Sequence, residues 1–221
     1  MDNKKFHNNL IVSTSPHIVT DEDTTKLMGT VLLAMLPALV ASTYIFGARV
    51  LLLAAVCIVA SVGFEWIYNM LAKKPQTISD LSAAVTGLLI AFNVPSSFPL
   101  WMAVIGCFVA IVVIKQLYGG IGRNFVNPAI TARIFLFISF AAQMTTWPLP
   151  RMAAKTDAVT GPTPLALVAG GASKSDLPSN MDMFLGFTGG SLGEVSALAI
   201  LVGGLFLIWR KVISPAIPCA F

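Results

Sequence analysis

Long runs of apolar residues alternate with short polar intervals through most of this chain. An α-helix rises about 1.5 Å per residue, so a run of about twenty apolar residues crosses the hydrocarbon core of a bilayer. One run, residues 81–94, is short for a full span because it stops at Asn93 and Pro95. The pattern predicts an all-α, polytopic transmembrane protein with about six transmembrane helices, one of them short or broken. The predicted helices cover residues 27–46, 50–71, 81–94, 100–117, 129–147 and 192–213.

Composition agrees with this class of protein and excludes several functions. The chain has 221 residues, of which 56% are hydrophobic and 11% are charged, which leaves too little polar surface for a soluble globule. The net charge is +4, but the basic residues are dispersed at the ends of apolar runs, so we expect no binding to nucleic acid. Cys57, Cys107 and Cys219 lie far apart, so we expect packing residues and no metal site.

The basic residues predict an orientation in the membrane. With a cytoplasmic N-terminus, ten of them fall on the inside and four on the outside, as the positive-inside rule requires. We therefore expect a multi-pass protein of a cell membrane with residues 148–193 on its outer face. The inside set is Lys4, Lys5, Lys26, Lys73, Lys74, Lys115, Arg123, Arg133, Arg210 and Lys211, and the outside set is Arg49, Arg151, Lys155 and Lys174.

These features divide the chain into five regions. Residues 1–26 lack a short apolar run followed by a small-residue cleavage site, so we expect no cleaved signal peptide. Pro37 should kink the first helix near its middle. The expected regions are a cytoplasmic N-terminal segment (1–26), a five-helix membrane region (27–147), an outer-face loop (148–193), the sixth transmembrane helix (194–213) and a C-terminal end (214–221).

Glu65 is the acidic residue that lies clearly inside an apolar helix. Burying a carboxylate in a membrane costs about 2–3 kcal/mol on insertion scales unless it is paired or neutral. One interpretation makes Glu65 part of an ion pathway. The other places it near enough to the cytoplasmic end, with Lys73 and Lys74 beyond it, to reach water or a partner subunit.

Two glycine-rich segments also allow two interpretations each. Residues 118–128, the Gly-Asn loop, contain Asn124 and Asn127; Asn127-Pro128 is typical of a helix start, so the loop is explained as a helix connector. Residues 189–194 read Gly-Gly-Ser-Leu-Gly-Glu and could begin the sixth helix, with Glu194 in its first turn. Backbone N–H groups at such a helix start also form an anion site, here with Gly190 and Ser191.

Thr163 is the most constrained residue of the longest polar interval. Gly161 and Pro162 precede it and Pro164 follows it, so its backbone can enter neither a helix interior nor a central strand. We therefore expect an exposed hydroxyl, presented on a rigid loop. On its own this observation also fits an ordinary turn residue.

Five stretches in this order resemble the RnfD/NqrB family of membrane subunits from ion-translocating redox complexes, and RnfD more closely. They are Ser79–Leu89 with its Val-Thr-Gly-Leu-Leu ending, Gly-Ile-Gly-Arg-Asn-Phe-Val-Asn-Pro-Ala from Gly120, Gln143–Trp147, Asp157–Leu165, and the Gly-Ser-Leu-Gly-Glu-Val-Ser run from Gly190.

The resemblance implies a covalent flavin. In the family, the Asp-x-x-Ser/Thr-Gly-x-Thr pattern is the signal by which a flavin transferase links FMN through its phosphate to the last threonine, which is Thr163 here. Asp157 would then be a recognition carboxylate, and Thr160 is a weaker attachment candidate beside Gly161. Gly190 and Ser191 could hold the phosphate. The resemblance also implies noncovalent riboflavin near Asn124 and Asn127.

The function implied is that of a prokaryotic membrane subunit, and not a stand-alone catalyst. It would relay electrons between ferredoxin and NAD within a complex that moves Na⁺ or H⁺, with the other subunits and the lipid bilayer as partners. Family members continue with further helices, so we expect this sequence to end early relative to them. The short third helix, Pro37 and Glu65 also fit a channel or secondary transporter without a redox cofactor. A structural scaffold subunit is a third hypothesis.

Overall fold

The computed structural model describes residues 23–151, 160–171 and 177–220, and the described chain is helical. Within these ranges the only β-type pairing is an isolated antiparallel bridge between Pro148 and Thr160. Helices α2 (Thr24–Phe46) and α3 (Arg49–Leu71) each have 23 residues and are long and apolar enough to cross a membrane. The shorter apolar helices are α4 (Ser82–Phe92), α5 (Leu100–Phe108) continued by the π-helix η2 (Val109–Gln116), α6 (Pro128–Ser139) and α10 (Ala197–Trp209).

All six predicted apolar helices are therefore present, but the fifth and the sixth are markedly shorter than predicted. The fifth does not reach Trp147: α6 ends at Ser139, and a separate turn of helix, α7 (Ala141–Met144), follows. The sixth does not begin at Leu192: α10 starts at Ala197, because the side chain of Ser196 caps it by accepting from the Ala199 N–H. Glu194 consequently lies in the loop before α10 and not in its first turn.

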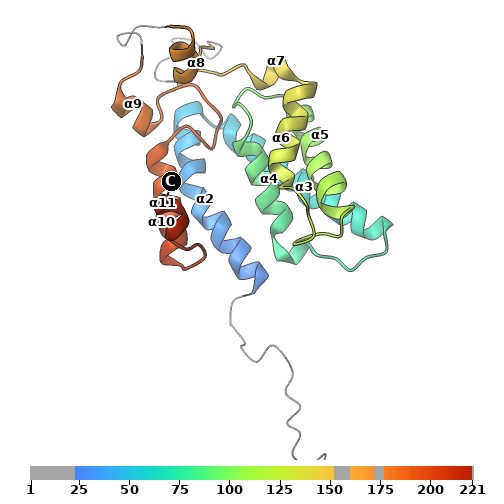
Figure 1. Ribbon diagram of the computed structural model, residues 1–221. Helices are drawn as coiled ribbons and strands as arrows, with labels where there is room; N and C mark the ends of the chain where they lie inside the picture. Colours follow the sequence, from blue (N-terminus) through green and yellow to red (C-terminus); the bar gives the residue numbers. More distant parts are fainter. Residues whose placement is uncertain (1–22, 152–159, 172–176, 221) are drawn as a thin grey trace, which may run out of the picture.

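The helices form two groups that pack through glycines. In Figure 1, α2 and α10 lie side by side, and α3 to α6 make up the rest of the bundle. A Cβ atom at Gly203 of α10 would overlap the Ala34 carbonyl oxygen of α2. A Cβ atom at Gly87 of α4 would lie 2.6 Å from the Cys57 carbonyl oxygen of α3. Helix backbones approach this closely only at small residues, the usual basis of helix packing in membranes.

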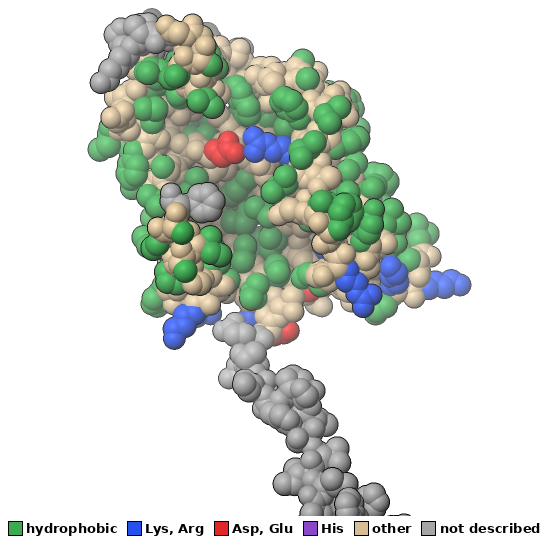
Figure 2. Space-filling view, in the orientation of Figure 1, with side chains coloured by type: hydrophobic (Ala, Val, Ile, Leu, Met, Phe, Trp, Pro, Cys, Tyr) green, Lys and Arg blue, Asp and Glu red, His purple; other side chains and the backbone are tan. Residues whose placement is uncertain are grey.

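The two ends of the bundle differ in charge. One end, at the top of Figure 1, carries α7 and the short helices α8 (Pro164–Ala169) and α9 (Asn180–Leu185). The opposite end contains the start of α2, the connection from α3 to α4 through the 3-10 helix η1 (Ile78–Asp80), and the end of α10. Figure 2 shows Lys and Arg side chains gathered toward this second end, while apolar side chains cover much of the same face. Arg133, one of the residues predicted on the inside, instead pairs with Glu194 in the loop before α10, and the orientation in the membrane stays a prediction.

Candidate functional site

Thr163 begins a helix at the α8 end of the bundle. Its backbone is extended (φ −69°, ψ 158°), and Pro164 occupies the first helical position. Its Oγ1 atom accepts a hydrogen bond of 3.2 Å from the Ala166 N–H. This cap uses one lone pair of the hydroxyl oxygen and leaves the O–H as a donor. The side chain is partly exposed, so the hydroxyl lies at the surface of the bundle.

The backbone just before Thr163 is held against two other segments. Thr160 forms the bridge with Pro148, and the Gly161 N–H donates to the Trp147 carbonyl oxygen at 3.1 Å. A Cβ atom at Gly189 would lie 3.5 Å from Cβ of Trp147 and 4.0 Å from the Gly161 carbonyl oxygen. Segments 147–148, 160–161 and 189 thus meet at one place. Asp157 lies outside the described residues.

The segment after Gly189 enters the bundle and does not start a helix. The Gly193 N–H donates to the Phe92 carbonyl oxygen at 2.9 Å, and the Leu192 N–H donates to that of Val94 at 3.4 Å. These two N–H groups are therefore unavailable to an anion, and the expected helix start at this point is wrong. Ser191 is 1% exposed, and its Oγ atom has no hydrogen-bond partner among the described residues. Of the anion site expected from the sequence, only Gly190 and the Ser191 hydroxyl are left as candidate donors.

An ion pair lies beside this segment. Arg133 of α6 donates from Nη1 to Oε1 of Glu194 at 3.1 Å and to Oδ1 of Asn93 at 2.9 Å. Asn93 ends α4, so the pair joins the segment before α10 to α4 and α6. The charge of Glu194 is thereby balanced by a cation from α6.

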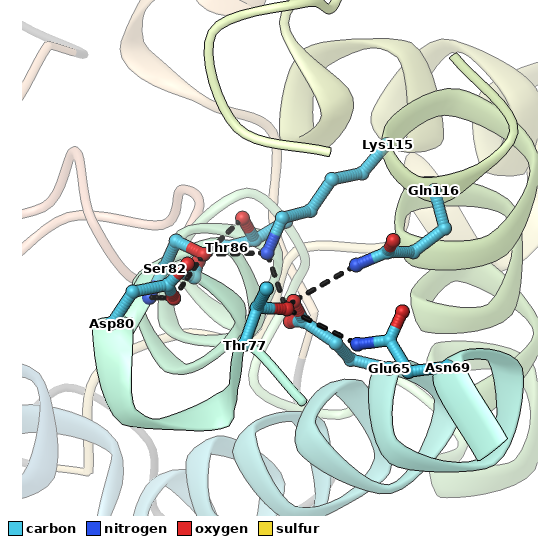
Figure 3. A network of polar contacts seen from close by, with 8 residues as sticks. All are labelled: Glu65, Asn69, Thr77, Asp80, Ser82, Thr86, Lys115 and Gln116. Carbon is cyan, nitrogen blue, oxygen red and sulfur yellow. Dashed lines mark hydrogen bonds and ion pairs between the residues drawn. The ribbon is translucent and has the colours of Figure 1, made fainter. Parts of the chain in front are cut away.

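The second polar site surrounds Glu65, inside the bundle (Figure 3). Glu65 is 0% exposed, and its Oε2 atom lies 2.8 Å from Nζ of Lys115, which comes from η2. Its Oε1 atom accepts from Thr77 Oγ1 at 2.6 Å and from Gln116 Nε2 at 2.8 Å. Both carboxylate oxygens are therefore hydrogen-bonded, as a buried charge requires.

Lys115 is held by a second set of oxygen atoms. Its Nζ atom donates to Ser82 Oγ at 2.5 Å, and Ser82 Oγ donates to Asp80 Oδ1 at 2.6 Å. Asn69 completes the network by donating to Thr77 Oγ1 at 3.1 Å. The cluster thus links α3, η1, α4 and η2 (Figure 3). Because Glu65 is enclosed by these partners, it does not reach water past Lys73 and Lys74, and that interpretation is wrong.

The Gly-Asn loop uses its asparagines for local structure. Asn127 caps α6, and its Oδ1 atom accepts from the N–H groups of Ala129 at 3.0 Å and Ile130 at 3.3 Å. With its amide nitrogen facing the carbonyls, Asn124 donates to Lys115 at 3.2 Å and to Gly120 at 3.1 Å. Nδ2 of Asn127 and Oδ1 of Asn124 remain for a ligand. The Gly-Asn loop and the Thr163 loop do not come together: one is beside Lys115, the other beside Trp147.

The polar partners of Glu65 are the part of this candidate site that sequence reasoning misses. In the sequence, Lys115 and Gln116 only end one apolar run, and Ser82 only begins another. A usable signal is present, since Lys115 is a cation within an apolar run and Glu65 is an anion within another, and membrane charges usually pair. Their separation of 50 residues, however, has no periodicity from which contact could be inferred.

These observations define a helical membrane protein with one buried ion pair among its described residues and a loop cluster at one end. Residues 11–221 match the sequence model of the NQR2, RnfD, RnfE family, and the chain belongs to this family. It is 46% identical over 215 residues to a subunit of the Na(+)-translocating ferredoxin:NAD(+) oxidoreductase complex of Acetobacterium woodii, covering 96% of this chain and 66% of that protein.

Other relatives carry related names. The chain is 39% identical to a subunit of the proton-translocating ferredoxin:NAD(+) oxidoreductase complex of Clostridium ljungdahlii, covering 94% of this chain and 64% of the relative. It is 33% identical to a subunit of the ion-translocating oxidoreductase complex of Mannheimia succiniciproducens, covering 95% and 69%. The chain therefore spans about two thirds of the length of these relatives. The resemblance drawn from the five sequence stretches is confirmed.

Proposed function

We propose that this chain is a membrane subunit of an ion-translocating complex that transfers electrons between ferredoxin and NAD, and that it carries FMN covalently on Thr163. The names of relatives from Acetobacterium woodii and Clostridium ljungdahlii support the first part. The coupling cation would be Na⁺ or H⁺, and the other subunits of the complex would be the partners. The subunit would sit in a prokaryotic cell membrane with a cytoplasmic N-terminus and Thr163 on the outer face.

The observation that carries the flavin proposal is the position of Thr163. Its hydroxyl is partly exposed at the start of α8, and the adjoining backbone is fixed by the Gly161 to Trp147 hydrogen bond of 3.1 Å. Another protein can reach such a hydroxyl, whereas a buried threonine would be inaccessible. The Gly189 segment packs against Trp147 and Gly161, and two residues further along it the unpartnered Ser191 Oγ is a donor suited to a phosphate oxygen. Both features support attachment of a flavin phosphate at Thr163.

Attachment is a phosphoryl transfer in which Thr163 supplies the nucleophile. Its Oγ1 atom forms a bond to the phosphorus of a flavin dinucleotide presented by a flavin transferase. The phosphoanhydride bond to the other nucleotide breaks, and the hydroxyl proton leaves with that phosphate or with solvent. Once bound, the flavin would accept and donate electrons. The chain itself supplies position and shielding.

In-gel flavin fluorescence of the denatured polypeptide tests the attachment. The wild-type band should fluoresce when the cells contain a flavin transferase, Thr163→Ala should be dark, and Thr163→Ser, which keeps a hydroxyl, should retain signal. Thr160→Ala tests the weaker attachment candidate, an exposed threonine three residues earlier in the same loop. A dark wild-type band would refute the FMN proposal. Fluorescence lost in Thr160→Ala but kept in Thr163→Ala would move the attachment point.

Electron transfer by the assembled complex separates a flavin relay from a scaffold. If the subunit is a relay, Thr163→Ala should assemble normally and lose turnover. Normal turnover in that variant would favour a purely structural role.

The Glu65 site supports the ion-translocation part of the proposal. Glu65 of the long helix α3 and Lys115 of η2 form a buried ion pair, and intramembrane charges of this kind mark ion pathways. Uptake of Na⁺ or H⁺ by vesicles containing the complex should fall in Glu65→Gln while flavin loading stays unchanged. Ion flux that persists in a protein with a dark flavin band would instead favour a channel or secondary transporter.

Riboflavin at the Gly-Asn loop is the third element of the proposal. The unused Nδ2 of Asn127 is a donor and the unused Oδ1 of Asn124 is an acceptor, which are the groups that an isoalloxazine edge pairs with. Asn127→Asp keeps the capping oxygen and removes the amide donor. Riboflavin extracted at wild-type levels from that variant would argue against the assignment.

A further inference from the structure

A cavity of about 380 Å³ lies at the α8 end of the bundle and is separate from the Glu65 cluster. It is enclosed by the turn between α2 and α3, the loop after α4, and the first residues of the polar loop that follows α7. Two arginines, Arg49 and Arg151, face the same space. The complete lining is Phe46, Arg49, Ser96, Ser97, Pro148, Leu149 and Arg151.

Arg49 is fixed in place by backbone oxygens. Its Nε atom donates to the Ser96 carbonyl oxygen at 3.2 Å, and Nη2 donates to those of Ser97 at 3.3 Å and Phe98 at 3.5 Å. A guanidinium has five N–H donors, so the donors of Nη1 remain for a ligand. Within the described chain, the Arg49 guanidinium therefore donates to neutral carbonyl groups and to no carboxylate.

Arg151 is placed by a glycine. Its N–H donates to the Ile45 carbonyl oxygen at 3.0 Å, which ties this residue to the end of α2. A Cβ atom at Gly47 would overlap Cζ of Arg151, so the guanidinium lies directly on Gly47. Gly47 also has a φ angle of +94°, a backbone conformation that residues with a side chain rarely adopt. The glycine therefore leaves the space that the guanidinium fills.

Neither arginine has a carboxylate partner in the part of the chain that the structure describes, where the ion pairs are Glu65 with Lys115 and Arg133 with Glu194. Both arginines are exposed residues that line one cavity, so an anion that enters it can interact with two positive charges. Guanidinium groups match the oxygens of phosphate in geometry and charge. We propose that the cavity between Arg49 and Arg151 binds the phosphate of a phosphodiester.

Two phosphodiesters can reach this cavity. It lies where the two long apolar helices end and begin, which is the level of lipid headgroups in a membrane. Its wall also borders the Thr163 loop, because Cδ2 of Leu149 lies 2.9 Å from the position of a Cβ atom on Gly161. The phosphate is therefore that of an anionic lipid headgroup or that of the flavin linked to Thr163, and the second source rests on the proposed function.

Binding of phosphatidylglycerol to the purified complex in detergent, measured by native mass spectrometry, tests the proposal. Diacylglycerol, which lacks phosphate, is the control lipid. Arg151→Gln is the main variant, because no hydrogen bond of its guanidinium holds the described fold together, whereas Arg49→Gln would also release the Ser96–Phe98 loop. Lys73→Gln makes the same charge change at the opposite end. Each protein is compared with its Thr163→Ala counterpart.

A lipid ligand predicts that Arg151→Gln weakens phosphatidylglycerol binding about tenfold, with or without Thr163→Ala, while Lys73→Gln does not. A flavin ligand predicts that wild type binds little of this lipid, that Thr163→Ala gains binding, and that adding Arg151→Gln removes the gain. Equal phosphatidylglycerol binding by wild type and Arg151→Gln in both backgrounds would overturn the proposal. A wild-type band without flavin fluorescence would refute the attachment of flavin at Thr163. The comparison of phosphatidylglycerol binding between wild type and Arg151→Gln would then still decide whether the cavity binds a phosphodiester.

Discussion

Nζ of Lys115 lies 2.8 Å from Oε2 of Glu65, and both side chains are shielded from solvent by the chain itself. The residues come from α3 and η2, helices that are joined only through α4 and α5 in sequence. A buried ion pair loses the hydration of both charges. The attraction between them offsets this cost only if every remaining polar atom of the two groups also has a hydrogen-bond partner. Here Thr77, Gln116 and Ser82 supply those partners.

Removing one charge should therefore be much worse than removing both. We expect Lys115→Met to lower the free energy of unfolding by about 3–5 kcal/mol, because Glu65 is left as an unpaired buried carboxylate. The double variant Glu65→Gln with Lys115→Met should recover much of that loss. The measurement is the unfolding midpoint in detergent for the two single variants and the double variant. Strictly additive losses would show that the two groups do not interact.

The three cysteines provide the readout for such measurements. Cys57 and Cys107 are buried, with Cys107 Sγ 3.6 Å from the Cys57 carbonyl oxygen, whereas Cys219 is exposed. A maleimide added to the folded protein should therefore label Cys219 quickly and the other two only on unfolding. Mass spectrometry before and after denaturation gives the number of labelled cysteines. In Cys219→Ser the folded protein should stay unlabelled, and rapid labelling of that variant would contradict the buried positions.

The cap of α6 separates a structural role of Asn127 from a ligand-binding one. Asn127→Ala should cost about 1 kcal/mol, because two N–H groups at the start of α6 lose their acceptor. Asn127→Asp keeps that acceptor and should be nearly as stable as wild type. The unfolding midpoints of both variants, with the buried cysteines as reporters, check this expectation. Equal destabilisation by the two substitutions would mean that the cap contributes little.

Sequence reasoning locates the apolar helices because each is a continuous run bounded by Pro, Asn or charged residues, as at Asn127-Pro128. It does not locate the end of α6, since apolar residues continue past Ser139. There Phe140 leaves helical geometry (φ −133°, ψ 49°) and packs edge-to-face on Trp101 of α5, with ring centroids 5.6 Å apart. A contact between residues so far apart in sequence has no local signature.

The same limit applies to the sites. Thr163 stands out because Pro162 and Pro164 restrict the backbone on either side of it, which is a local property that sequence reports directly. The oxygens around Lys115 and the carbonyls around Arg49 come from segments that only the folded chain brings together. For Asn127, sequence predicts the helix start that it caps, but the contacts of Asn124 with the Lys115 and Gly120 carbonyls depend on the folded loop.

Two neighbouring glycines of α10 give the sharpest test of the packing of α10 on α2. A Cβ atom at Gly203 would overlap the Ala34 carbonyl oxygen, whereas one at Gly204 would meet nothing within 4 Å. Gly203→Ala should therefore push α10 away from α2 and cost at least about 1–3 kcal/mol. Gly204→Ala should be neutral or slightly stabilising, since alanine favours helix by about 1 kcal/mol over glycine. The unfolding midpoints of both variants provide the measurement. Similar midpoints would mean that α10 does not pack on α2 through this face, because chain position and substitution are otherwise matched.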